Sequence, residues 1–177
     1  MNTLRCMAAA AALVLAAAPG QAAAAPKGEI VDFGLTAGRR IMATPTIGET
    51  GLEPAREMKN IRYFERTDRI EARLCRNFGL TIRLTDAIPK ALPRSVSVKV
   101  LHPRFTRTDG KTSIEDRFQS AVIDGLTHIG FTFDHEWEME PGSWTFIVSA
   151  GGQEIARKDF IITAPPPGTP NSDCGIG

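Results

Sequence analysis

The clearest pattern in the chain is a two-residue alternation that runs from Ile70 to Leu84. Seven of the eight even-numbered positions in this stretch are apolar, whereas the odd-numbered positions are mostly polar or charged. Such alternation is typical of an antiparallel strand with one buried and one solvated face. We predict one long strand here, with a bulge or bend at Asn77 or Gly79. The apolar residues of the even phase are Ile70, Ala72, Leu74, Phe78, Leu80, Ile82 and Leu84.

The same alternation predicts further strands on both sides of this segment. Glu29–Thr36 carries its apolar residues at odd positions, and Ser95–Leu101 alternates up to the pair His102-Pro103, which we expect to end that strand. Later strands follow, with turn signals between them at Pro141-Gly142 and Gly151-Gly152. These later strands are Leu126–Phe133, whose apolar phase continues through His135, Trp137 and Met139; the row Trp144, Phe146 and Val148; and Glu154–Thr163.

The segments between these strands give weaker signals. Thr108–Lys111 is typical of a hairpin turn, and Ala43–Pro54 is rich in Thr, Pro and Gly, which indicates a loop. Glu53–Asn60 is compatible with one or two helical turns. Ser113–Asp124 fits either a helix or a strand, and the neighbouring strands favour a strand. Several short strands separated by turns predict an all-β, antiparallel β-sandwich.

The end of the predicted sandwich resembles a known class of domain. The run Pro141–Val148, a Gly-Gly hairpin and Lys158–Ile162 together resemble the closing strands of immunoglobulin-like domains in bacterial exported proteins. With the opening Val31-Asp32-Phe33-Gly34, the chain is similar to an uncharacterised family of short exported bacterial domains. The resemblance implies an immunoglobulin-like sandwich and supplies no catalytic residues. The disulfide pattern of immunoglobulins is missing, because Cys174 lies beyond the last predicted strand.

The N-terminus has the features of a cleavable secretory signal peptide. A short start with one positive charge, Arg5, precedes the apolar run Met7–Ala18, and small residues follow Pro19-Gly20. The alternative is an uncleaved anchor, but about 12 residues of helix span only about 18 Å of a hydrocarbon core about 30 Å thick. We therefore expect a signal peptide at 1–24, a sandwich domain at 28–163 and a proline-rich tail at 164–177. The mature protein is expected to be periplasmic or secreted, with no membrane span.

Charge and cysteine content narrow the picture further. The chain has 21 basic and 20 acidic side chains, so removal of Arg5 leaves 20 of each. This balance gives no electrostatic case for nucleic acid or an anionic membrane. Cys6 lies in the signal peptide, so Cys75 and Cys174 are the only possible pair in an oxidising compartment. We predict that disulfide, which would tether the proline-rich tail; the alternative is two free thiols.

One segment gathers residues that could carry chemistry. Metal ions need imidazole and carboxylate groups that converge on one point. His128 and His135 are seven positions apart, so on a continuous strand they would face opposite sides, roughly 23 Å apart. A turn between them could bring them together. The candidate metal ligands are His128, Asp134, His135 and Glu136.

No motif points to an enzyme or to a cofactor. The chain has no Gly-x-Ser-x-Gly elbow, phosphate loop or dinucleotide fingerprint. Trp137 alternates with acidic residues, so it is either a core residue or an exposed aromatic anchor for a partner. The leading hypothesis is a non-catalytic module that binds a protein or envelope component, and strand addition at an edge strand is the first route to examine. The alternative is a small periplasmic enzyme or metal-binding protein that uses the candidate ligands above.

The first prediction concerns processing. Protein recovered from an exporting bacterial host should lack its first 22 or 24 residues, because the small residues that signal peptidase requires precede these positions. Intact-mass measurement of the purified protein tests this. A mass that corresponds to the uncleaved chain in the membrane fraction would contradict it.

Overall fold

The structure is a computed structural model that describes residues 26–41, 51–52, 57–85 and 92–174. The predicted signal peptide lies outside the described residues. Among the residues described, no helix is long and apolar enough to cross a membrane. The elements are β1 (Lys27–Ile41), β2 (Glu57–Glu65), β3 (Arg69–Glu71), β4 (Asn77–Thr85), β5 (Ser95–Thr106), β6 (Thr112–Ala121), β7 (Leu126–Thr132), the 3₁₀ helix η2 (Glu136–Glu138), β8 (Gly142–Ala150) and β9 (Gln153–Thr163).

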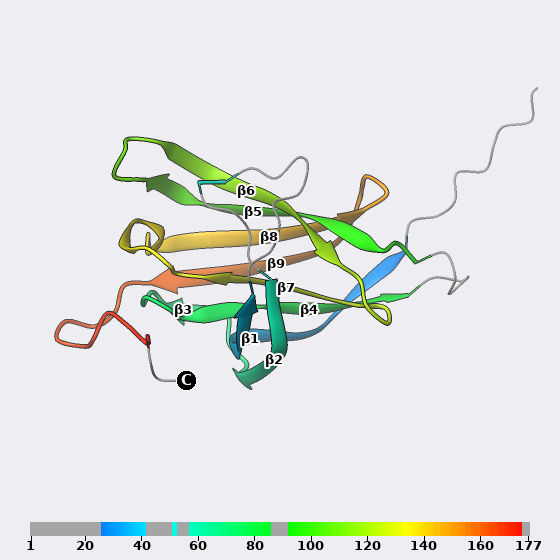
Figure 1. Ribbon diagram of the computed structural model, residues 1–177, viewed down its shortest axis with the longest axis horizontal. Coiled ribbons are helices and arrows are strands. Elements are labelled where there is room, and N and C mark those ends of the chain that lie inside the picture. Colours follow the sequence, from blue (N-terminus) through cyan, green and yellow to red (C-terminus); the bar gives the residue numbers. More distant parts are fainter. Residues whose placement is uncertain (1–25, 42–50, 53–56, 86–91, 175–177) are drawn as a thin grey trace, which may run out of the picture.

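The strands form two sheets that pack face to face, as Figure 1 shows. The four-stranded sheet has the order β2-β1-β4-β7, and the five-stranded sheet has the order β3-β9-β8-β5-β6. All pairings are antiparallel except that of β3 with β9, which is parallel. The predicted all-β sandwich is confirmed.

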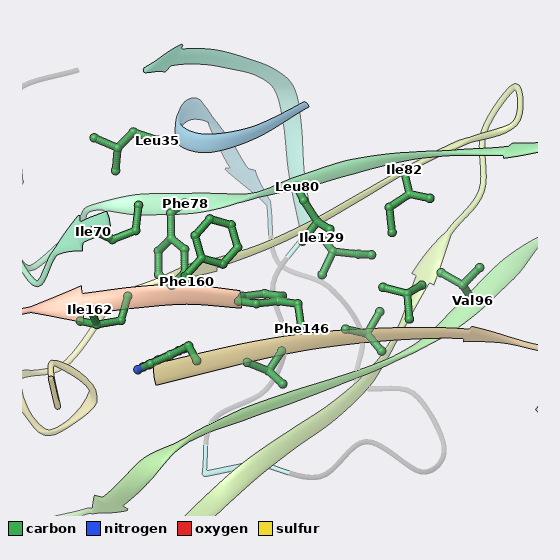
Figure 2. Packing of buried hydrophobic residues seen from close by; sticks show 14 of the residues in the cluster. Leu35, Ile70, Phe78, Leu80, Ile82, Val96, Ile129, Phe146, Phe160 and Ile162 are labelled. Carbon is green, nitrogen blue, oxygen red and sulfur yellow. The ribbon is translucent and has the colours of Figure 1, made fainter. Parts of the chain in front are cut away.

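The core is an aromatic cluster that joins the two sheets (Figure 2). Phe78 on β4 has no exposed surface, and its ring lies 5.2 Å from Phe160 and 5.8 Å from Trp144, which belong to the other sheet. These contacts are edge-to-face, the arrangement that aromatic quadrupoles favour. The predicted inward row of Trp144, Phe146 and Val148 is fully buried, as is Phe160. The alternation in these strands therefore predicted the buried face correctly.

The long strand predicted from Ile70 to Leu84 is in fact two strands in different sheets. β3 pairs with β9 in the five-stranded sheet, whereas β4 lies inside the four-stranded sheet. The chain crosses between them through residues 72–76, where Cys75 takes a left-handed backbone conformation with φ 63°. The even phase still points inward on both sides, since Ile70 and Phe78 are fully buried. The predicted bend is present but lies before Asn77.

Other local predictions need correction as well. β5 does not end at His102-Pro103 but continues to Thr106, with a register shift between Leu101 and Phe105 in its pairing with β6. Such a bulge accommodates a proline, which cannot donate to the ladder. Of the segment 53–60, for which helical turns were an option, residues 57–60 belong to β2, and residues 53–56 lie outside the described residues. The ambiguous segment 113–121 is a strand, as the neighbouring strands indicated.

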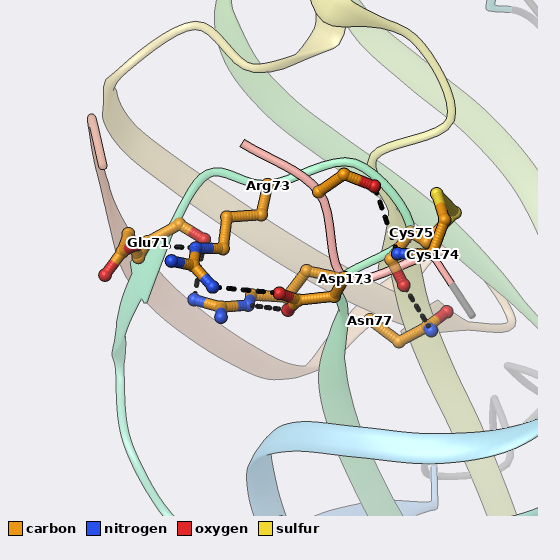
Figure 3. A network of polar contacts seen from close by, with 8 residues as sticks. Glu71, Arg73, Cys75, Asn77, Asp173 and Cys174 are labelled. Carbon is orange, nitrogen blue, oxygen red and sulfur yellow. Dashed lines mark hydrogen bonds and ion pairs between the residues drawn. A yellow bond between two sulfur atoms is a disulfide. The ribbon is translucent and has the colours of Figure 1, made fainter. Parts of the chain in front are cut away.

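The C-terminal tail is held against the crossing segment by covalent, polar and backbone contacts (Figure 3). The predicted disulfide between Cys75 and Cys174 is present. Asp173 receives hydrogen bonds from the guanidinium groups of Arg73 and Arg76 at 3.0 and 2.7 Å. Partial burial alone would raise the pKa of Asp173, but these hydrogen bonds from Arg76 and Arg73 hold it below its ordinary value.

Backbone hydrogen bonds add to this attachment. The amide of Leu74 donates to the carbonyl of Asn171, and the amide of Asp173 donates to the carbonyl of Leu74, both at 2.8 Å. Residues 171–173 of the tail are therefore paired with the crossing segment, in addition to the disulfide that the sequence predicted.

We expect the disulfide to be a large part of the stability of the domain. It closes a loop with a sequence separation of 99 residues, and the chain-entropy model gives about 4 to 5 kcal/mol for a loop of that length. Replacing both cysteines by alanine should lower the free energy of unfolding in urea by about this amount. Reduction of the wild-type protein should lower it equally. An unchanged denaturation midpoint, or a free thiol in the non-reduced protein, would contradict this.

Candidate functional site

The candidate site is an open groove on the solvent-facing side of the five-stranded sheet. It has a volume of about 490 Å³ and runs over β6, β5, β8 and β9. We call it the basic groove, because cationic side chains form its central row. It is lined by Ser97, Val98, Lys99, Arg117, Phe118, Gln119, Ile147, Ser149, Gly152, Glu154 and Arg157.

Strand register builds the central row of the basic groove. Lys99 on β5 lies opposite Arg117 on β6 and, on its other side, opposite Ile147 on β8. Ile147 in turn lies opposite Arg157 on β9. Side chains of directly paired residues project from the same face, so these four form one line across four strands. Three of the four are cations.

A bulge in β9 places one of these cations on the groove side. Glu154 pairs with Ser149, and Ala156 pairs with Val148, so the register shifts at this point and leaves Ile155 as the extra residue. Without the bulge, Glu154 and Arg157 would lie on opposite faces, because they are three positions apart. With it, they form a two-pronged ion pair with distances of 2.9 and 2.7 Å.

The outer cations of the row are paired, whereas the central one is not. Arg117 donates to Glu115 at 2.7 Å, and this hydrogen bond lowers the pKa of Glu115. Arg157 lowers the pKa of Glu154 in the same way. The charge of Lys99 contributes to both lowered pKa values, yet within the described part of the chain no carboxylate lies within 4.0 Å of its ammonium group. Lys99 is therefore a cation opposite another cation, an arrangement that costs stability.

The comparisons with known proteins give a family and a fold. The family model described as "Domain of unknown function (DUF3859)" matches residues 48–162. This chain belongs to that family. Among solved structures, the DUF3859 chain is similar to an immunoglobulin-like protein from Pseudomonas aeruginosa, with a TM-score of 0.55 and 16% sequence identity. The match covers 77% of this chain and 97% of the other. No curated protein matches the chain.

The family and the similar structure agree with the resemblance seen in the sequence. The DUF3859 match begins at residue 48, before β2, and ends at Ile162 in β9, so it includes β2 to β9. At 16% identity the Pseudomonas protein shows the fold alone. The chain is thus a DUF3859 protein with an immunoglobulin-like sandwich, and its function has to be argued from its surface.

The candidate metal ligands do not converge. His128 lies on β7, where its Nδ1 is 3.1 Å from the hydroxyl of Tyr63 and 3.4 Å from that of Thr81. His135 precedes η2, and its ring stacks on Trp137. Glu136 is exposed and Asp134 is half-buried. Within the described ranges, no group of three or more His, Cys, Asp or Glu residues could hold a metal ion.

Trp137 occupies a different setting from the strand predicted for it. The chain leaves β7 after Thr132, and Trp137 lies in η2. Its ring is half-buried and makes an edge-to-face contact with Phe105 at 5.7 Å. Trp137 packs against the core with one side, so the role of binding anchor stays a prediction for its remaining surface.

Glu138 in η2 is a buried acid that the sequence pattern did not single out. It is 5% exposed, and its carboxylate accepts hydrogen bonds from the backbone amides of Asp134 and His135 at 2.6 and 2.8 Å. Burial raises the pKa of Glu138 from 4.5 to about 7, although these two hydrogen bonds act in the opposite direction. Only the turn into η2, which interrupts the predicted strand, buries this side chain.

A buried polar pair, His102 and Asp116, lies between β5 and β6. The imidazole of His102 has no exposed side-chain surface, and its Nε2 is 3.7 Å from Oδ2 of Asp116. Asp116 thus points inward from β6, which is the outermost strand of its sheet. An inward-pointing charge on an edge strand is one of the features by which proteins oppose pairing with a foreign strand. The groove face is therefore a better candidate than this edge.

The buried titratable groups predict how stability depends on pH. The folded pKa of Glu138 is raised from 4.5 to about 7, so its contribution is fully present below pH 4.5 and is lost as the pH rises to 7. Burial lowers the pKa of His128 from 6.5 to about 4, so its contribution is present above pH 6.5 and is lost as the pH falls to 4. Between pH 4.5 and 6.5 the two effects oppose each other.

Glu138→Gln removes one of these two contributions to the pH dependence of stability. The free energy of unfolding of the variant, relative to wild type, should rise between pH 4.5 and 7 by an amount on the order of 3 kcal/mol. Urea denaturation across this range measures the difference. Glu140→Gln, at an exposed position two residues away, is the control and should run parallel to wild type. Parallel curves for Glu138→Gln as well would show that its carboxylate does not titrate in this window.

Proposed function

We propose that this protein is an exported, non-catalytic immunoglobulin-like module that binds a protein or envelope component through the basic groove. The observation that carries the proposal is the row formed by Arg117, Lys99 and Arg157 on the solvent face of the five-stranded sheet. Lys99 lies directly opposite Arg117, and like charges in direct cross-strand pairs are unfavourable, although the charge of Lys99 also acts favourably on Glu115 and Glu154. A bound partner that supplies negative charge would turn this cost into an attraction.

Other features of the chain support export and a non-catalytic role. The Cys75–Cys174 disulfide supports export, since such bonds persist mainly in oxidising compartments. A non-catalytic role is supported by the composition of the groove, where serine hydroxyls and paired ions surround Lys99. The groove lining contains no histidine or cysteine that could serve as a base or nucleophile beside them. Binding through a sheet face also avoids the edge of β6, where the inward-pointing Asp116 opposes pairing with a foreign strand.

Site-specific photocrosslinking tests this function in cells that produce the protein from its own gene. A benzophenone amino acid in place of Gln119, which is exposed and lines the groove, should yield one discrete adduct. The same amino acid in place of Arg83, exposed on β4 of the opposite sheet, is the control and should yield none. Adducts of equal yield from both positions, or none from Gln119, would refute binding through the groove.

A further inference from the structure

The geometry of the basic groove points to a particular ligand. We propose that it binds an extended acidic peptide segment of a partner protein, with carboxylates at alternate positions lying across the strands over Arg117, Lys99 and Arg157. This rests on the proposed function, which locates binding in the groove, and adds the chemistry of the partner. Three features of the groove favour this ligand: the spacing of the cations, the availability of their charge and the lining on either side of the row.

The spacing of the row matches that of a peptide in extended conformation. Arg117 and Arg157 are separated by three strand intervals, which amounts to about 14 Å at the usual spacing of about 4.8 Å. In an extended peptide, side chains at alternate positions project from the same side about 6.7 Å apart. Three alternate carboxylates therefore cover about 13 Å. The outer two reach the arginines, and Lys99 can extend toward the middle one.

The charge of the row is available to such a ligand. The side chains of Arg117 and Arg157 are 49% and 48% exposed, and their acids lie on the same strands at Glu115 and Glu154, beside the row. These ion pairs hold the guanidinium groups in place while leaving donors toward solvent, since a guanidinium carries five N–H groups. Ile147 is only 8% exposed although it lies on the solvent face outside the core cluster. Ile147 lies between Lys99 and Arg157 in the register, and long basic side chains commonly bury their aliphatic stems along such an apolar neighbour, which accounts for its low exposure.

The lining beside the row favours a peptide over a uniformly anionic surface. One row along, Gln119, Ser97 and Ser149 offer amide and hydroxyl groups, and the amide of Gln119 already donates to Ser97 at 3.0 Å. Such groups can form hydrogen bonds with the backbone of the bound peptide and with small polar side chains between its carboxylates. Glu115 and Glu154 flank the cations and would repel a polyanion or an anionic lipid surface, which presents negative charge everywhere. A peptide with separated carboxylates avoids both acids.

The experiment uses a synthetic peptide with blocked ends and the sequence Thr-Glu-Thr-Glu-Thr-Glu-Thr. Titration of the folded mature protein at low ionic strength, followed by NMR of its backbone amides, should shift signals of β5, β6, β8 and β9 around the groove. A peptide of the same composition with its three glutamates consecutive should bind more weakly, because adjacent side chains of an extended chain point to opposite sides. Equal binding of the two peptides would overturn the alternating arrangement.

Lys99→Glu gives the decisive variant, and urea denaturation of the variant checks that it remains folded. The substitution places a carboxylate opposite Arg117 but removes the attraction of Lys99 to Glu115 and Glu154. These two effects oppose each other, so we expect the variant to have a midpoint of urea denaturation close to that of wild type. Its affinity for the alternating peptide should fall at least about tenfold, since an attractive charge becomes a repulsive one. Arg83→Glu makes the same charge change at an exposed position on the opposite sheet and should bind as wild type does. Undiminished binding by Lys99→Glu would overturn the proposal.

A second anion separates a peptide site from a general anion site. Inorganic tripolyphosphate is the probe, and we expect it to bind more weakly than the alternating peptide. If it binds as tightly and displaces the peptide, the groove recognises charge alone and the proposal is wrong. The proposed function can fail separately: peptide binding without a crosslink from Gln119 would refute partner binding through the groove in cells. A crosslink without peptide binding would refute only the ligand assigned here.

Discussion

The packing of the two inner sheet faces around Phe78 is the constraint on which the rest of the molecule depends. Phe78 contacts aromatic rings from both sheets, and its neighbours Trp144, Phe146 and Phe160 are completely buried. Because side chains alternate along a strand, burying Phe146 and Val148 directs Ile147 and Ser149 outward. The same rule on β5 buries Val98 and Val100 and turns Lys99 outward. The outward orientation of Lys99, Ile147 and Ser149 in the basic groove thus follows from the packing of the core.

Much of the fold could be predicted from the sequence, because its strongest signals are local. Neighbouring residues alone determine three of these features: the row Trp144, Phe146 and Val148, the glycine pair of the β8–β9 turn, and the strand preference of segment 113–121. The crossing at residues 72–76 could not be predicted, since Ala72, Leu74 and Arg76 keep the even phase while the chain changes sheets. Trp137 was assigned to a strand for a similar reason: the alternation continues through η2, although the backbone turns.

The candidate site was harder to predict, because register creates it. Lys99, Arg117 and Arg157 each occupy an outward position of a strand, and each alone indicates an ordinary solvated residue. Only the pairing of β6, β5, β8 and β9 places them in line. Arg157 also depends on the bulge at Ile155, which has no sequence signal of its own. His128 and His135 lie close together in the sequence, which suggested a metal site, but strand and turn geometry separate their side chains.

The attachment of the tail also orders the events of biosynthesis. Cys75 leaves the ribosome 99 positions ahead of Cys174, and β3 beside it pairs with β9, the last strand among the described residues. Cys75 therefore cannot pair with Cys174 until the intervening strands have been synthesised. Closing so long a loop carries an entropic cost that the already assembled sheets reduce by bringing its ends together. Because Cys174 follows β9 in the chain, an oxidised pair marks a molecule in which β9 has already been synthesised.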